Sequence, residues 1–218
     1  MILLTSLSGM SPLDVLATIP ARTTCDILIE RYFLLCSPCF NIIHRPTFEK
    51  EYNDFWENPT SCELVWVSMF LGMMILALQS YYGNVPESLQ GNGKPEEIWK
   101  TWMSGSEVCS YWGKIGLKPG LNNVRAIILW ILGQASQRSN WDWAEAVCPS
   151  VGILVRVSQS MGLHRDPKWF VMSPFEAESR RKVWMVVQYL DTNMSIVQGL
   201  PTIISPTGMD VEPPINVN

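Results

Sequence analysis

Residues 173–201 read SPFEAESRRKVWMVVQYLDTNMSIVQGLP and contain the best-marked helix of this sequence. Ser173 is followed by a proline and then by Glu176, the pattern of a capping box with proline at the first helical position. Gly199 and then Pro201 end the helix, because glycine adopts a positive φ easily and proline cannot continue a helix. One face of the predicted helix is apolar and consists of Val183, Val186, Val187, Leu190, Met194 and Val197.

The rest of the chain also shows helical periodicity, and no two segments show the pattern of a β-hairpin. We expect helices over about 25–37, 46–58, 62–82, 95–112, 123–135 and 141–161. Pro149 either kinks the last of these or begins a new helix. The sequence therefore predicts an all-α fold, a multi-helical bundle of about seven helices. The expected N-caps are Thr23 or Thr24, Ser61 and Asn122.

The composition is that of a folded chain without a basic surplus. Hydrophobic residues make up 47% of the 218 residues and charged residues 17%, which provides enough apolar material for a sizeable core. The 16 Lys and Arg against 20 Asp and Glu give a formal net charge of −4. A domain that binds duplex DNA by itself usually shows a net basic face, because it neutralises phosphates. Direct DNA binding is therefore not predicted.

The apolar segments do not indicate secretion or a membrane span. The N-terminus has no basic start, and its first apolar run is too short for the core of a signal peptide. The longest apolar stretch, 64–78, is shorter than the roughly 20 residues that a spanning helix needs. We expect a buried helix there.

The cysteines include one pair with a spacing known from metal and redox sites, Cys36-Ser-Pro-Cys39, with His44 nearby. A structural zinc site would need a fourth ligand, and the chain has no second C-x-x-C. A thioredoxin-like redox pair would need a βαβ pattern, which is absent. The sequence favours reduced core cysteines and leaves a metal or redox role as the alternative.

Two stretches are similar to motifs of the fungal-specific transcription factor domain, the middle homology region of zinc binuclear-cluster transcription factors. Residues 155–167, VRVSQSMGLHRDP, resemble its "avR-a-slGLHRDp" motif. Residues 175–184, FEAESRRKVW, together with the later Asp, Ser, Gly and Pro positions, resemble "fEaE-RRRvWW…lD…S…GrP". Upstream matches are YF at 32–33, IHRPTF at 43–48 and VRA at 124–126.

The chain departs from the family pattern at several places. Met185 stands where the family usually repeats Trp, and Pro149 where an aromatic residue is common. The six-cysteine zinc cluster is not found in this sequence, and the family region usually continues beyond residue 218. We therefore expect an N-terminal extension (1–22), the front half of the regulatory domain (23–205) and a C-terminal tail (206–218), without the DNA-binding zinc cluster.

The resemblance implies a nuclear transcription regulator of a dedicated gene set. It implies action through a protein partner, self-association or a small hydrophobic effector, without direct nucleic-acid contact, membrane binding, enzymatic activity, metal or cofactor. Uncovered apolar helix faces would favour oligomerisation or poor solubility. The alternative is a stand-alone small-molecule binder or a cyclase-type enzyme of fungal secondary metabolism.

The resemblance and the local sequence give the motif residues structural roles. Gly162 lets the chain turn back, and His164 is expected to be a hydrogen-bonded cap, because no Ser or Cys partner for a general base can be recognised. Asp191 sits among apolar neighbours and is expected to accept hydrogen bonds from Arg156 or Arg165, joining the two motifs. The complete set of predicted motif residues is Gly162, Leu163, His164, Arg165, Asp166, Arg180, Arg181, Trp184, Asp191, Gly199 and Pro201.

Ten Trp and eleven Met are more than packing alone needs. Flexible thioethers and aromatic walls suit an adaptable apolar pocket, although a core has the same composition. The pocket that the sequence offers consists of Trp99, Trp102, Met73, Met74 and Trp141.

Overall fold

The computed structural model describes residues 9–81, 84–86, 89, 93–115, 120–136 and 142–215, with the backbone alone for 142–146. Within these ranges the regular elements are all helices, which confirms the predicted all-α class. The α-helices are α1 (Pro12–Ala17), α2 (Arg22–Arg31), α3 (Arg45–Glu57), α4 (Leu64–Gln79), α6 (Pro95–Trp112), α7 (Leu121–Ala135), α8 (Asp142–Ser160) and α9 (Pro174–Gln198). Short π or 3₁₀ turns are η1 (Tyr32–Cys36), η2 (Pro59–Ser61), η3 (Pro167–Trp169) and η4 (Pro206–Gly208).

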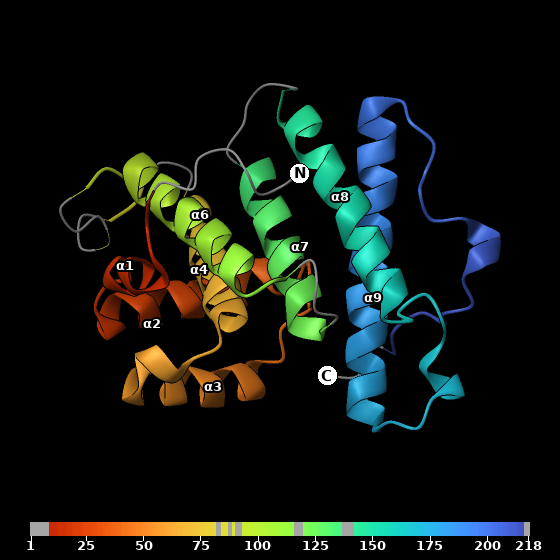
Figure 1. Cartoon of the computed structure of the whole chain (residues 1–218), viewed down its shortest axis with the longest axis horizontal. Coiled ribbons are helices and arrows are strands. Elements are labelled where there is room, and N and C mark those ends of the chain that lie inside the picture. The colour runs from red at the N-terminus through yellow and green to blue at the C-terminus, as the bar shows by residue number, and fades with distance from the viewer. Residues whose placement is uncertain are drawn as a thin grey trace.

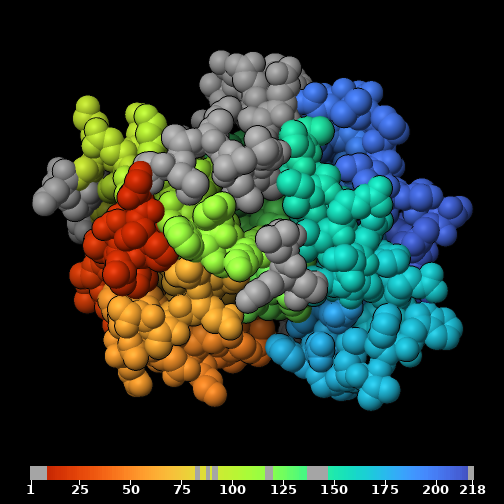
Figure 2. Space-filling view, viewed as in Figure 1, coloured from red at the N-terminus to blue at the C-terminus, as the bar shows by residue number. Residues whose placement is uncertain are grey.

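The helices are arranged around α4, which packs against α2, α6 and α7 (Figure 1). Helix α7 then contacts α8, and α8 lies along α9, so α7 connects the α4 core to the last two helices. The residues after α9 form the edge of the molecule beyond this helix, drawn in blue in Figure 2. The molecule therefore has two regions, a helical core around α4 and an α8–α9 pair that carries the C-terminal segment.

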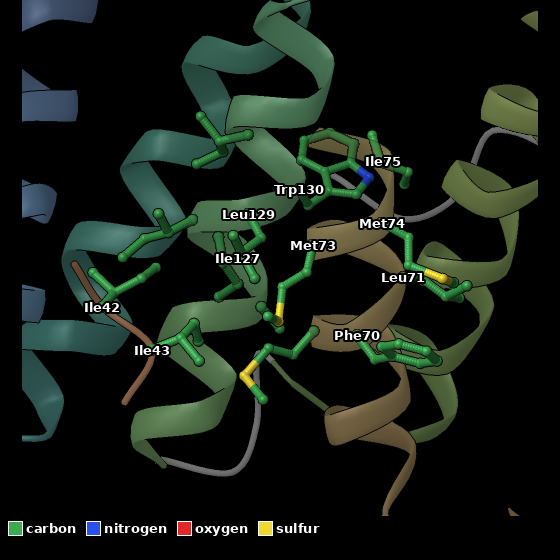
Figure 3. Packing of buried hydrophobic residues seen from close by; sticks show 14 of the residues in the cluster. Ile42, Ile43, Phe70, Leu71, Met73, Met74, Ile75, Ile127, Leu129 and Trp130 are labelled. Atoms are coloured by element: carbon green, nitrogen blue, oxygen red, sulfur yellow. The ribbon is translucent and has the colours of Figure 1, made fainter. Parts of the chain in front are cut away.

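Helix α4 is the centre of the core because nearly all of its side chains are apolar and buried. Gly72 permits its close approach to α7, since a Cβ atom at this position would lie 2.8 Å from the Cβ of Leu129. Figure 3 shows the consequence: Met73 points toward α7 and Met74 toward α6, among other apolar side chains. A helix that is apolar all round is expected to be buried in this way.

The helix ends follow local rules where the capping residues are strong. The Ser173 hydroxyl accepts a hydrogen bond from the Glu176 N–H at 3.2 Å, and Gly199 ends α9 with φ +64°. Pro149 lies inside the single continuous helix α8.

Three expected N-caps are wrong. Helix α2 begins at Arg22, ahead of the expected threonine caps, and continues through η1 to Cys36. Residues Pro59–Ser61 form a separate 3₁₀ turn, so Glu63 rather than Ser61 precedes α4. Gly120 takes the cap position expected for Asn122, which lies one residue inside α7.

The N-terminal extension contributes a helix to the core. Val15 of α1 has no exposed surface and packs against α6, where a Cβ atom added to Gly105 would lie 3.0 Å from the Val15 Cγ1 atom. The Trp102 indole N–H of α6 donates to the Thr18 carbonyl at 3.3 Å. Among the described helices, none is long and apolar enough to cross a bilayer.

Candidate functional site

The first motif forms a corner, residues 161–169, between α8 and α9. Gly162 has φ +69°, and its N–H donates to the Gln159 carbonyl at 2.9 Å. The Leu163 N–H donates to the Ser158 carbonyl at 3.0 Å, and the Leu163 side chain is buried. These two bonds are those of a Schellman motif, in which a left-handed glycine lets the chain cover the last carbonyls of a helix. The corner therefore arises from local sequence.

Asp166 is the hub of the corner. Its side chain has no exposed surface and accepts two hydrogen bonds from Arg181 of α9, Nε to Oδ2 at 3.2 Å and Nη2 to Oδ1 at 3.0 Å. The backbone N–H groups of Lys168 and Glu212 each donate to it at 2.9 Å. A buried carboxylate with this many donors joins three segments of the chain: the corner, α9 and the C-terminal segment.

The electrostatics of the hub follow from these bonds. Burial by itself raises the pKa of the Asp166 carboxyl, but hydrogen bonds from Arg181 and two backbone N–H groups outweigh it. The pKa of Asp166 therefore lies well below its ordinary value. The same hydrogen bond raises the pKa of Arg181, so both partners stay charged.

A second carboxylate, Asp210, holds the C-terminal segment (209–212) on the corner. It accepts hydrogen bonds from the Asp166 N–H and the Trp169 indole N–H, both at 2.9 Å, and forms an ion pair with Arg165 at 3.1 Å. These contacts lower the pKa of Asp210, with the Asp166 N–H as the largest cause. Lys168 adds an ion pair with Glu212 at 2.5 Å.

Arg180 covers the end of α8. Its guanidinium donates to the Met161 carbonyl at 2.7 Å and lies 5.9 Å from the ring centre of Phe170. Partial burial lowers the pKa of Arg180. The adjacent arginines of the second motif therefore have different partners, the end of a helix for Arg180 and a carboxylate for Arg181.

The expected partner of Asp191 is wrong. Asp191 is buried in α9 and accepts from the backbone N–H groups of Ile203 at 3.2 Å and Ile204 at 2.9 Å. Arg156 instead bonds to Gln159, and Arg165 pairs with Asp210. The reason is that the chain turns back after Gly199 and brings its own N–H groups to Asp191, whereas Arg181–Asp166 joins the two motifs.

The return of the chain after α9 uses Gly199 and Pro201. The Leu200 N–H donates to the Ser195 carbonyl at 2.9 Å, which repeats the Schellman pattern seen at Gly162. The Ser195 hydroxyl donates to the Pro201 carbonyl at 3.4 Å. Both predicted residues therefore lie at the turn that positions the segment bound by Asp191.

His164 and Trp184 lie next to each other, with ring centres 6.3 Å apart. Trp184 is entirely buried. Within the described part of the chain, neither His164 Nδ1 nor Trp184 Nε1 has a hydrogen-bond partner. The expected capping bond is therefore not formed by His164 Nδ1; the His164 carbonyl instead accepts from the Asp210 N–H at 3.3 Å.

The suggested pocket residues lie in different surroundings. Met73 and Met74 have no exposed surface, and Trp102 is buried with its indole bonded to Thr18. Trp99 is half-buried at the edge of the core, and Trp141 lies outside the described residues. Full burial of the methionines fits a role in the core, and the ligand pocket stays a prediction.

The cysteine pair and His44 lie on the connection from η1 to α3. His44 Nδ1 is 2.8 Å from the Thr47 hydroxyl, and its ring packs against Phe175 of α9. Among the described residues no three His, Cys, Asp or Glu side chains are grouped as for a metal ion.

Sequence reasoning missed Asp210 and Glu212, which it left in the C-terminal tail. A signal was available, because acidic residues two apart lie on one side of an extended segment. This side faces the basic corner, and the intervening Val211 packs against the core.

Comparisons with known proteins agree on one family. The family described as "Fungal specific transcription factor domain" matches residues 29–106 and 126–218. The equisetin cluster transcription factor eqxF of Fusarium heterosporum is 30% identical over 93% of this chain and 30% of its own length. The transcription factor phm2 of Pyrenochaetopsis sp is 28% identical over 95% of this chain and 28% of its own. The Zn(2)-C6 fungal-type transcription factor mpsB of Macrophomina phaseolina is 28% identical over 94% of this chain and 27% of its own length.

The chain spans less than a third of the length of these relatives. No solved structure matches.

Proposed function

Because this chain belongs to the fungal specific transcription factor domain family, we propose that it regulates transcription in the nucleus as a helical regulatory domain. The observation that carries the proposal is the family match, which covers both halves of the chain and includes the corner and α9. The relatives named above are described as transcription factors, and their alignments cover more than nine-tenths of this chain. By similarity to the equisetin and fusarisetin A cluster factors, the regulated genes would form a secondary-metabolite cluster.

The proposed mode of action is through a partner rather than through DNA. The net charge is −4, and three cations of the corner are paired with carboxylates. Arg165, Lys168 and Arg181 pair with Asp210, Glu212 and Asp166 respectively. Nucleic-acid binding requires cations that are available to phosphates, so this basic group supports a structural role.

A protein partner or a second copy of the chain would bind the outer face of α9. Met185, Tyr189 and Ile196 expose about half or more of their surface there. Apolar side chains grouped on one helix are typical of an interaction surface. Size-exclusion chromatography at increasing concentration would distinguish self-association from a separate partner.

The comparisons point away from an enzyme and do not favour the cyclase-type alternative, since the relatives are described as transcription factors. The proposed regulatory role needs no catalytic residue. The corner groups described above are occupied in holding three segments together, which fits this role.

A tethering experiment tests the proposal. The full chain is fused to an unrelated DNA-binding module in a filamentous fungus, and a reporter with the matching operator is measured. We expect several-fold altered transcription for the wild type and for the control Lys100→Ala, an exposed position on α6 rather than on the outer face of α9. Trp184→Asp, which places a charge in the core, should abolish the effect at equal protein level. A folded wild-type fusion that leaves the reporter at the level of the module alone would contradict the proposal.

DNA contact is tested separately with the unfused chain. A mobility-shift assay on promoter fragments should show no retardation at low ionic strength, where electrostatic binding is strongest. Salt-dependent retardation would instead show that the chain binds DNA itself.

A further inference from the structure

The structure places the two cysteines of the C-x-x-C sequence in one turn. Helix η1 ends at Cys36, and the Cys36 carbonyl accepts from the N–H groups of Cys39 at 3.1 Å and Phe40 at 3.2 Å. A turn closed by such a bond brings the first and fourth α-carbons within about 7 Å of each other. Disulfides span α-carbon distances of about 4.4–6.8 Å, so the backbone already has a suitable spacing.

The two thiols differ from the other cysteines in accessibility. Cys39 is exposed and Cys36 is half-buried, whereas Cys25 and Cys109 are fully buried. A reagent in solution therefore reaches Cys39 first and finds Cys36 beside it. The remaining cysteines are half-buried elsewhere in the fold, Cys62 between η2 and α4 and Cys148 in α8.

The two sulfur atoms also interact electrostatically. Burial raises the pKa of the Cys36 thiol, the nearby Cys39 raises it further, and the Arg31 guanidinium lowers it. Arg31 is fixed, because it donates to the Ser80 hydroxyl and carbonyl and stacks on the Tyr81 ring. The partly buried Cys36 therefore lies beside the more accessible Cys39, which is the arrangement of a resolving cysteine next to a reactive one.

We propose that Cys36 and Cys39 form a reversible dithiol–disulfide site that is oxidised by a small disulfide such as glutathione disulfide. The Cys39 thiolate attacks one glutathione sulfur, forms a mixed disulfide and releases one glutathione, which takes up the proton that Cys39 lost. The Cys36 thiolate then attacks the Cys39 sulfur, forms the intramolecular disulfide and releases the second glutathione with the second proton. The protein loses two electrons and two protons, and one glutathione disulfide becomes two thiols.

The disulfide would form at the start of the segment that connects η1 to α3. The residue after Cys39, Phe40, contacts Tyr189 of α9, with ring centres 5.6 Å apart. The following Ile42 and Ile43 are buried in the core. The site therefore lies beside the exposed face of α9. The proposal does not rest on the transcriptional role and stands or falls by thiol chemistry alone.

The test is equilibration of the full chain in glutathione buffers from reducing to oxidising, followed by acid quench, alkylation with N-ethylmaleimide and mass spectrometry of peptides. We expect the wild type to lose two of its six free thiols, with the disulfide mapped to Cys36–Cys39 and reversed by dithiothreitol. Cys36→Ser and Cys39→Ser should each form no intramolecular disulfide. The control Cys62→Ser should still form it, because Cys62 lies in a different connection, between η2 and α4.

Other outcomes overturn the proposal. The wild type could keep six thiols at the most oxidising poise, or Cys39 could form only mixed or intermolecular disulfides. The disulfide could also map to Cys62 and Cys109, which are close enough for Cys62 to contribute to the raised pKa of Cys109. If a serine variant fails to fold by circular dichroism, the peptide map of the wild type decides alone.

Discussion

The core around α4 and the corner between α8 and α9 are stabilised by different interactions. In the core, α4 contacts its neighbours through apolar side chains, and the contribution of each depends on area and volume. In the corner, one buried carboxylate with Arg181 and two backbone N–H groups joins three segments. Apolar packing tolerates changes that conserve volume, whereas a buried charge requires its partner. The two regions should therefore respond differently to mutation and pH.

The largest effect is expected when the hub loses its charge. Asp166→Ala leaves the Arg181 guanidinium partly buried without its carboxylate and should lower the free energy of unfolding by about 3–5 kcal/mol. Urea unfolding followed by Trp fluorescence measures this change. In the double variant with Arg181→Met, part of the loss should be recovered, because no unpaired charge remains. Additive losses in the double variant would show that the pair is not coupled.

Acid should break the same bond without mutation. The pKa of Asp166 in the folded chain is lower than in the unfolded chain, so its contribution is complete above the unfolded value, about 3.9. As the pH falls from there through the folded value, this contribution is lost. Urea midpoints measured from pH 6 down to pH 2 should therefore fall mainly below about pH 4, and should fall less in Asp166→Ala. Parallel curves for the two proteins would mean that other groups control the acid response.

A cavity in the α4 core should cost less than loss of the hub. Met73→Ala removes a fully buried side chain and should destabilise the chain by about 3 kcal/mol. Met73→Leu conserves volume and should cost less than about 1.5 kcal/mol. Thermal unfolding of the three proteins by circular dichroism provides the comparison. Equal losses for Ala and Leu would mean that the site requires methionine itself, as a ligand contact would.

The close approach of α4 and α7 predicts an opposite response at two helical glycines. Gly72→Ala adds a Cβ atom 2.8 Å from the Leu129 Cβ and should destabilise by about 1–2 kcal/mol, after the gain in helix propensity. Gly152→Ala is the matched control, because its Cβ would meet only the Ile203 side chain at 3.7 Å. This control should be neutral or should raise the midpoint of thermal unfolding. A stable Gly72→Ala would mean that the two helices can move apart at no cost.

The smallest effect is expected at the rim of the corner. Arg165→Gln removes a half-exposed ion pair with Asp210 and should change the free energy of unfolding by less than about 1 kcal/mol. The difference from the wild type should shrink further in 0.5 M salt, because exposed charges are screened. Urea titration at low and high salt measures both values. A loss as large as that of Asp166→Ala would make Asp210 a second hub.

Local sequence was sufficient where one residue controls one turn. Ser173, Gly162 and Gly199 mark the ends of α8 and α9, because capping and positive φ depend on near neighbours. Local rules were not sufficient at Ser61 and Asn122, where a 3₁₀ turn and a glycine occupy the expected cap positions. The α1 helix was missed because a helix of six residues carries little periodicity by itself.

The amino-acid sequence by itself determined that this chain is helical, where α9 begins and ends, and that its motifs resemble those of one family. Hydrophobic period, strong caps such as Ser173 and turn glycines act over a few residues, so they can be recognised in the sequence. Only the tertiary structure decided which charges meet. Asp166 pairs with Arg181 and Asp191 binds Ile203 and Ile204, because these partners depend on how the chain returns after each helix.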